Sequence, residues 1–207
     1  MIHVFIADDH RIVRSGLRAV IDEEPDMQVV GEAGNGWDVL HALEQPECAV
    51  DVLILDLSMP VLGGFEVLRR ARKLRPAVQV LVLSMYPREH WETQMQSAGA
   101  AGYLSKSDSD TQLIDALRTV ALGEPYFSVL LQDEPTLDTA PPHQALTGRE
   151  LQVFLLVIEG RSVMDIAAAL NLGQSTVSTH MARIRAKLQV DTVAAMVTYA
   201  HREGLIA

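Results

Sequence analysis

The stretch Val52-Leu53-Ile54-Leu55-Asp56-Leu57 decides the fold class of this chain of 207 residues. Its first four residues are apolar without alternation, which is typical of a strand buried on both faces of a parallel sheet. Similar apolar runs recur through the first half of the chain. We therefore expect strands over His3–Ala7, Met27–Ala33, Val52–Asp56, Val78–Ser84 and Ala101–Leu104.

Segments with helical spacing of apolar residues separate and follow these runs. They predict helices over Ile12–Ile21, Gly36–Leu43, Phe65–Leu74, Glu89–Ser97 and Asp110–Leu122. Alternating strands and helices form right-handed crossovers, which place helices on both faces of a parallel sheet. The pattern predicts an α/β domain with a five-stranded, doubly wound parallel sheet of flavodoxin-like type.

Three proline-containing interruptions follow the last of these helices, at Pro125, Pro135 and Pro141-Pro142. Proline lacks an amide donor and breaks helices and central strands, so we interpret residues 123–143 as a linker. The apolar stretch Tyr126–Leu131 is a candidate for docking on the first domain. This division gives a first domain over residues 1–122 and a second over 144–207.

The second domain reads as helical throughout. Thr147 and Glu150 form a capping box at the start of a helix that ends near Glu159. We expect further helices over Val163–Leu170, Gln174–Leu188 and, capped by Asp191, Thr192–Glu203. The short turn Asn171–Gly173 joins two of them, which is the pattern of a helix-turn-helix in an all-α, four-helix domain.

Composition narrows the class of protein. The chain is 48% hydrophobic and 21% charged, which excludes wholesale disorder. Residues 144–207 carry a net charge of +1 and the remainder −11, so the two parts are expected to have different partners. A single cysteine excludes a disulfide framework. We find no membrane-spanning run and no signal peptide, and expect a cytoplasmic protein.

Polar residues stand where the predicted strands end. Asp8 and Asp9 follow the first strand, Asp56 ends the third, Ser84 ends the fourth and Lys106 follows the fifth. The carboxyl ends of parallel strands meet at one edge of a sheet, where ligands bind. Three carboxylates this close repel one another unless a cation is present. A hard divalent ion with oxygen ligands fits, and we expect Mg²⁺.

This set of side chains has the elements of phosphoryl transfer to a carboxylate. Asp56 can act as a nucleophile towards phosphorus. The metal ion and Lys106 can neutralise phosphoryl oxygens, while Ser84 donates a hydrogen bond. The product would be an aspartyl phosphate.

The same residues are similar to those of the receiver domain of bacterial two-component response regulators. Asp56-Leu57-Ser58-Met59-Pro60 with Gly63-Gly64 matches the receiver phosphorylation loop, and residues 98–106 match its fifth-strand region. The resemblance implies that Asp56 is the phosphoacceptor and that a sensor histidine kinase is the donor. It implies Mg²⁺ binding by Asp9 directly, by Asp8 through water and by the backbone carbonyl of Ser58.

It further implies that Ser84 and Lys106 contact the phosphoryl group and that Tyr103, three residues before the lysine, is the switch residue. The second domain resembles the LuxR-type helix-turn-helix of the NarL/FixJ family. Leu146–Glu150, Ile166-Ala167 with Leu170, and Thr176, Val177, His180, Ile184, Lys187 and Leu188 carry that resemblance.

The helix over residues 174–188 is the expected DNA-reading element, since Val177, Met181, Ile184 and Leu188 form a buried stripe. Family members usually carry a basic residue at the position of Ser178. The absence of a basic residue at this position predicts weak, dimer-dependent binding to double-stranded promoter half-sites with a shallow salt dependence. The candidate DNA-contacting residues are Ser175, Thr176, Ser178, Thr179, Ala182, Arg183 and Lys187.

The sequence therefore predicts a phosphorylation-controlled DNA-binding transcriptional regulator, acting as a homodimer and not as an enzyme. One alternative is a signalling adaptor whose second domain binds a protein. Another is a phosphohydrolase, but such enzymes usually carry an aspartate two residues after the nucleophile, where this chain has Ser58. We interpret His180 as a packed, hydrogen-bonded histidine, and Arg149 and Glu150 as structural.

Overall fold

A computed structural model describes residues 1–86, 88–128 and 141–206, and it divides into two compact units, Met1–Ser128 and Val129–Ala207. Residues 129–140 of the predicted linker, including the second half of the stretch expected to dock, lie outside the described residues. Among the described residues, no helix is both long and apolar enough to cross a membrane.

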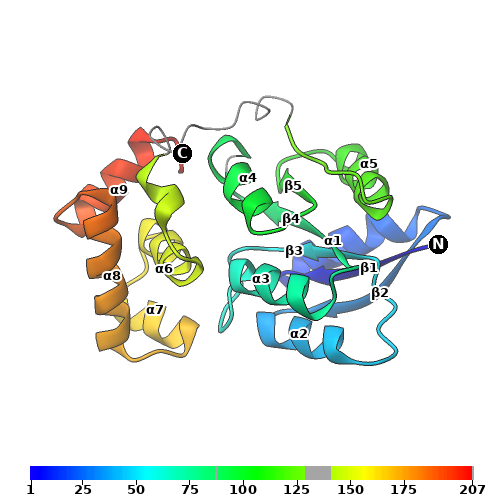
Figure 1. Ribbon diagram of the computed structural model, residues 1–207, viewed down its shortest axis with the longest axis horizontal. Helices are drawn as coiled ribbons and strands as arrows, with labels where there is room; N and C mark the ends of the chain where they lie inside the picture. The colour runs from blue at the N-terminus through cyan, green and yellow to red at the C-terminus, as the bar shows by residue number, and fades with distance from the viewer. Residues whose placement is uncertain (87, 129–140, 207) are drawn as a thin grey trace. The chain divides into compact units, whose positions relative to one another are not determined.

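The first unit is an α/β domain, as predicted (Figure 1). Its five strands are all parallel and lie in the order β2-β1-β3-β4-β5. In chain order the elements are β1 (Ile2–Ala7), α1 (Arg11–Asp22), β2 (Met27–Ala33), α2 (Gly36–Glu44), β3 (Val52–Leu55), α3 (Gly64–Leu74), β4 (Gln79–Ser84), α4 (Arg88–Ser97), β5 (Gly102–Ser105) and α5 (Asp110–Ala121).

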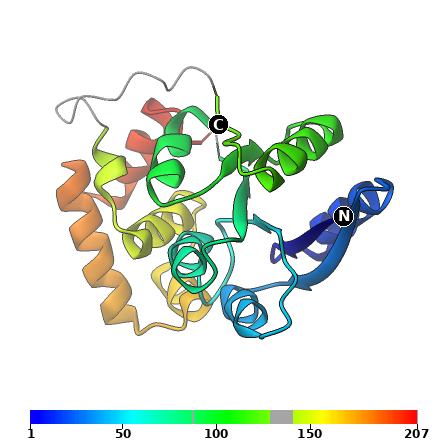
Figure 2. The ribbon, with the colours of Figure 1, turned by 45° about the vertical axis from the view of Figure 1, so that its right-hand side comes forward.

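The sheet is buried on both faces, which explains why its strands lack alternation. α1 and α5 cover one face, where Ile21 and Leu117 pack on Val4, Ile54 and Leu81. α2, α3 and α4 lie on the other face (Figure 2). All four residues of β3 are buried, so the central strand is held in register from both sides.

The described part of the predicted linker begins with an extension of the sheet. Tyr126 forms an isolated parallel bridge with Gly102, and its carbonyl accepts a hydrogen bond from the amide of Tyr103 at 3.1 Å. The expectation that no helix forms in this proline-rich region is wrong at its end. A 3-10 helix, η2, covers Pro142–Ala145, because proline in a first helical turn has a suitable φ and no amide that needs a partner.

The second unit is all-α, as predicted. Its helices are α6 (Gly148–Ile158), α7 (Val163–Leu170), α8 (Gln174–Leu188) and α9 (Val193–Arg202). The capping box of Thr147 and Glu150 is present. Asp191 does not cap the last helix: Thr192 does, accepting from the amide of Ala195 at 3.0 Å, because the helix starts one residue later than expected.

A tight glycine contact holds α3 against the end of β3. A Cβ atom on Gly64 would lie 2.0 Å from the carbonyl oxygen of Asp56, and the amide of Gly64 donates to the carbonyl of Leu57 at 3.1 Å. By contrast, a Cβ on Gly16 in α1 would meet nothing within 4 Å. The loop that carries Asp56 therefore depends on the missing side chain at residue 64.

We expect Gly64→Ala to destabilise the first unit by about 1–3 kcal/mol, because backbone atoms must move to admit the methyl group. Gly16→Ala is the matched control and should stabilise it by about 0.5–1 kcal/mol through helix propensity. Both tryptophans, Trp37 and Trp91, lie in this unit, so urea unfolding followed by tryptophan fluorescence reports on it selectively. Equal free energies of unfolding for Gly64→Ala and Gly16→Ala would contradict the close approach of Gly64 to the Asp56 carbonyl.

Candidate functional site

Two buried carboxylates lie side by side where β1 and β3 end. Ala7 pairs with Leu55 across the two strands, so the residues that follow, Asp8 and Asp56, emerge together. The amide of Asp56 donates to the carbonyl of Ala7 at 2.8 Å. Asp8 is 1% exposed and Asp56 is 2% exposed. Burial of two acids at this depth requires a positive partner.

Lys106 supplies that charge from the loop after β5. Its Nζ lies 2.6 Å from Oδ2 of Asp8 and 2.8 Å from Oδ2 of Asp56. The backbone amide of Lys106 donates to the carbonyl of Ser84 at 2.8 Å, which ties this loop to the end of β4. Three strand ends thus contribute to one ion cluster, as the sequence predicted.

The surroundings of this cluster shift the pKa values of Asp56 and Lys106. Burial raises the pKa of the Asp56 carboxyl above its ordinary value; Lys106 opposes that shift and the charge of Asp8 adds to it. Burial disfavours the ammonium form of Lys106, yet Asp56 and Asp8 outweigh burial and raise its pKa. The lysine therefore remains charged, and the buried carboxylate of Asp56 is held at an electrostatic cost.

The loop after β3 holds the other oxygen of Asp56. The amide of Ser58 donates to Oδ1 of Asp56 at 3.2 Å, and the Ser58 hydroxyl donates to the Tyr86 hydroxyl at 3.4 Å. Val61 has a φ of 64°, the left-handed region, within the turn that leads to α3. Asp56 thus presents its carboxylate in a fixed orientation between Lys106 and the loop.

Oxygen donors suitable for a hard cation gather on the solvent side of this cluster. Ligand atoms of Asp8, Asp9, His10 and Asp56 all lie within 4.8 Å of one another. The side chain of Asp9 is 31% exposed, whereas those of Asp8 and Asp56 are buried. Three carboxylates, of which that of Asp9 is open to water, fit the preference of Mg²⁺ for oxygen ligands and retained waters.

His10 is a member of this group that the sequence interpretation missed. Its Nδ1 lies 2.9 Å from Oδ1 of Asp9 and 3.3 Å from Oδ1 of Asp8. The available signal was its position directly after the two aspartates, where it becomes the residue before α1.

Ser84 and Tyr103 converge on the backbone of Tyr86. The Ser84 hydroxyl accepts from the amide of Tyr86 at 3.2 Å, and the Tyr103 hydroxyl donates to the carbonyl of Tyr86 at 3.0 Å. Both side chains are fully buried. Burial raises the pKa of the Tyr103 hydroxyl, with a smaller opposing effect from Ser84, so it stays a neutral donor. The two residues connect β4 and β5 to the start of α4.

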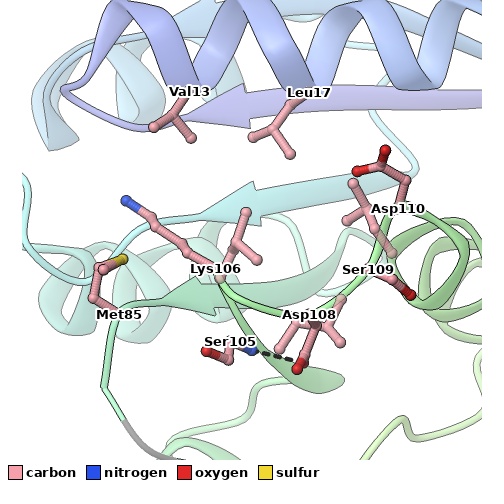
Figure 3. Close-up of a pocket in the computed structure, with 11 residues that line it drawn as sticks. Val13, Leu17, Met85, Ser105, Lys106, Asp108, Ser109 and Asp110 are labelled. Carbon is pink, nitrogen blue, oxygen red and sulfur yellow. Dashed lines mark hydrogen bonds between the residues drawn. The ribbon is translucent and has the colours of Figure 1, made fainter.

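A pocket of about 260 Å³ lies beside the lysine, between α1, β4 and the loop that leads into α5 (Figure 3). Its lining includes the apolar side chains of Leu83 and Leu104 and the acidic side chains of Asp108 and Asp110. The side chain of Asp108 accepts from the amide of Ser105 at 2.9 Å, which shapes the loop around Lys106.

In the second unit, α7 and α8 form the predicted helix-turn-helix. Asn171 ends α7 in the left-handed conformation, with φ 51°, which turns the chain sharply into α8. The stripe Val177, Met181, Ile184 and Leu188 is buried, as predicted. The opposite face of α8 is exposed, and it carries Ser175, Thr176, Ser178, Thr179, Ala182 and Arg183.

Lys187 differs from the other candidate DNA-contacting residues. Its Nζ donates to Oε2 of Glu150 at 2.6 Å and to the carbonyl of Ala145 at 2.9 Å. Burial opposes ionisation of Glu150, but Lys187 and Thr147 outweigh it and lower the pKa of that carboxyl. The ammonium is thus engaged inside the domain, where it joins α8 to the start of α6.

Arg149 and Glu150 have structural contacts, as interpreted from the sequence. Arg149 donates to the carbonyl of Leu170 at 2.9 Å, at the end of α7. The expectation of a hydrogen-bonded His180 is wrong for one ring nitrogen: its Nδ1 is buried without a hydrogen-bond partner. Burial, followed by the charges of Arg149 and Arg183, lowers the pKa of His180, so it packs as a neutral ring.

Comparison with known proteins agrees with both units. Residues 4–118 match the family model described as "Response regulator receiver domain", and residues 144–200 match "Bacterial regulatory proteins, luxR family". The chain is 34% identical to response regulator UvrY of Escherichia coli K12, over 99% of this chain and 96% of that protein. It is 32% identical to the transcriptional regulatory protein LiaR of Bacillus subtilis, over the full length of both.

Solved structures of full-length proteins are also similar. RcsB from Salmonella enterica serovar Typhimurium, bound to promoter rprA in the presence of the phosphomimetic BeF3⁻, is 28% identical with a TM-score of 0.71. The match covers 96% of this chain and 97% of that chain.

Taken together, the buried aspartate beside a lysine and the helix-turn-helix that follows define a phosphorylation-controlled DNA-binding transcriptional regulator. The chain belongs to the NarL/FixJ family of two-component response regulators, with a receiver domain followed by a LuxR-type domain.

The raised pKa of Asp56 gives a testable pH dependence. A carboxyl whose folded-state pKa is raised stabilises the fold below its ordinary pKa and loses that contribution as the pH rises through the raised value. Lys106→Met removes the opposing cation, so the loss of stability relative to wild type should grow as the pH rises above the ordinary pKa of an aspartate, to about 3 kcal/mol.

Tryptophan-monitored urea unfolding measures this effect in the first unit. Adding Asp56→Asn to Lys106→Met should reduce the growth with pH, because only Asp8 is then left without its cation. Lys73→Met, at an exposed lysine of α3, is the charge-matched control. A pH-independent loss in Lys106→Met would mean that lost packing, not charge, is responsible.

Proposed function

We propose that Asp56 accepts a phosphoryl group from the phosphohistidine of a sensor histidine kinase. The observation that carries this is the ion cluster itself: a carboxylate 2% exposed, with Lys106 at 2.8 Å and Asp8 sharing the same ammonium. A carboxylate oxygen of Asp56 attacks phosphorus, the phosphorus–nitrogen bond breaks, and the electron pair returns to the donor imidazole. The chain is a phosphoryl acceptor in this step and not an enzyme with turnover.

The metal site proposed for this step uses Asp8, Asp9 and Asp56 together with the backbone carbonyl of Ser58. When bound, Mg²⁺ neutralises the phosphoryl oxygens. The residues do the remaining work: Lys106 holds one phosphoryl oxygen by charge, and the Ser84 hydroxyl donates to another. The Ser84 oxygen accepts from the Tyr86 amide at 3.2 Å, so a shift of this hydroxyl towards the phosphoryl group would alter that hydrogen bond.

We further propose that Tyr103 transmits this change and that residues 1–122, 123–143 and 144–207 act as receiver, linker and DNA-binding domain. Ser84 and Tyr103 contact opposite polar atoms of one residue, Tyr86, so a change at Ser84 alters the partner of Tyr103. The output is a homodimer on promoter half-sites in the bacterial cytoplasm. Related structures support this: RcsB has been solved in complex with DNA and, in another structure, as two dimers bound to two parallel DNAs.

Incubation with a small-molecule phosphodonor and Mg²⁺ should add the mass of one phosphoryl group to the wild-type chain. Asp56→Asn should show no such addition, because the nucleophilic oxygen is lost. Asp38→Asn, at an exposed aspartate of α2, is the matched control and should behave as wild type. Peptide mapping by mass spectrometry locates the group, and a phosphoryl group elsewhere than on Asp56 contradicts the proposal.

The exposed face of α8 is proposed to read DNA in the major groove. Ser175, Thr176, Ser178 and Thr179 offer hydroxyls, Ala182 offers a methyl group suited to thymine, and Arg183 offers a phosphate contact. Lys187 was predicted to contact phosphate as well; its ammonium is already paired with Glu150. The few free cations on this face imply that affinity comes from two copies acting together.

We expect the phosphorylated protein to bind its selected DNA with a slope of log affinity against log salt shallower than about −6. Ser178→Arg should tighten binding and steepen the slope, because it adds a phosphate contact to each copy. Ser178→Gln is the uncharged control and should keep the slope. Genomic-fragment selection, then fluorescence anisotropy over a salt series, makes the measurement. Tight binding by a monomer at physiological salt would refute dimer dependence.

A further inference from the structure

The imidazole of His10 borders the proposed metal site closely enough to take part in it. Its Nδ1 is 2.9 Å from Oδ1 of Asp9 and 3.3 Å from Oδ1 of Asp8. Neighbouring ligands around an octahedral ion with bonds of about 2.1 Å are about 3 Å apart. The two distances from the His10 nitrogen to these aspartate oxygens therefore match the spacing of neighbouring ligands around such an ion.

The loop that carries His10 is held in place by its backbone. The amide of His10 donates to Oδ1 of Asp8 at 2.8 Å, and the guanidinium of Arg14 donates to the carbonyl of Asp8 at 2.6 Å. The amide of Asp8 donates in turn to the carbonyl of Ala33 at 3.1 Å. By contrast, the ring of His10 is 65% exposed, so it can shift by a few tenths of an ångström without disturbing the core.

We infer that Nδ1 of His10 is a ligand of the ion held by Asp8 and Asp9, and that it biases the site towards Mn²⁺ over Mg²⁺. The inference rests on the metal site of the proposed function. Imidazole nitrogen suits divalent transition metals, whereas Mg²⁺ prefers oxygen. Asp9 and His10 lie on the exposed side of the cluster, away from the oxygens of Asp8 and Asp56 that contact Lys106.

Pulsed electron paramagnetic resonance of bound Mn²⁺ tests the inference directly. The full chain is loaded with Mn²⁺ at about pH 8, where a histidine imidazole is ordinarily neutral. Wild type should show coupling of the Mn²⁺ electron spin to nitrogen, and His10→Gln should lose it. His3→Gln is the matched control. His3 also contacts an aspartate, Asp51, but it lies at the start of β1, whereas the proposed metal site follows the end of that strand.

Competition between Mn²⁺ and Mg²⁺ gives a second readout. His10→Gln should lower the preference for Mn²⁺ over Mg²⁺ by about tenfold, since the replacement offers an amide oxygen of similar reach. Bound Mn²⁺ without nitrogen coupling in wild type, or an unchanged preference in His10→Gln, overturns the inference while leaving the metal site intact. A further variant, Asp9→Asn, removes a carboxylate of the metal site. If the wild-type chain binds no more Mn²⁺ than this variant does, the metal site itself is overturned as well.

Discussion

The ion cluster of Lys106 with Asp8 and Asp56 is the constraint on which the receiver depends. Two carboxylates at 1% and 2% exposure repel each other and have lost their hydration, so a single ammonium must satisfy both. That ammonium comes from β5, beyond β4 in the sheet. The order β1-β3-β4-β5 and the bond between the Lys106 amide and the Ser84 carbonyl are what bring it within reach. The packing of the whole sheet is thus used to hold one unfavourable arrangement of charge.

A phosphoryl group or a divalent ion changes that balance at once, because each brings charge to a site with one cation for two acids. Tyr86 is the place where such a change meets the rest of the domain. Its amide bonds to Ser84, its carbonyl to Tyr103 and its hydroxyl to Ser58, so three strand ends meet on one residue. Tyr86 also packs against Trp91 of α4, with ring centroids 5.9 Å apart. The polar site and the apolar face of α4 are therefore connected through a single side chain and its backbone.

The sequence predicted the sheet, its helices and the strand ends well, because buried parallel strands and capped helices leave strong local patterns. It placed Asp8, Asp56 and Lys106 together for the same reason: a parallel sheet gathers its carboxyl ends. Contacts that join distant segments left no such pattern. Nothing local in Lys187 distinguishes it from Arg183, yet one is paired with Glu150 across 37 residues and the other is exposed. Asp191 and Thr192 are both good caps, and the choice between them depends on where α9 packs.

The pairing of Lys187 also bears on how this family member uses DNA. Residues 144–207 carry a net charge of only +1, and one of their cations, Lys187, is committed to the fold. Residues 1–143 carry −11, so the chain as a whole is repelled by a polyanion. A single recognition helix with hydroxyls and one methyl group cannot offset that repulsion by phosphate contacts alone. When two such helices are joined in a dimer, the number of base contacts doubles while little additional translational and rotational entropy is lost. Dimerisation is therefore the step at which binding begins.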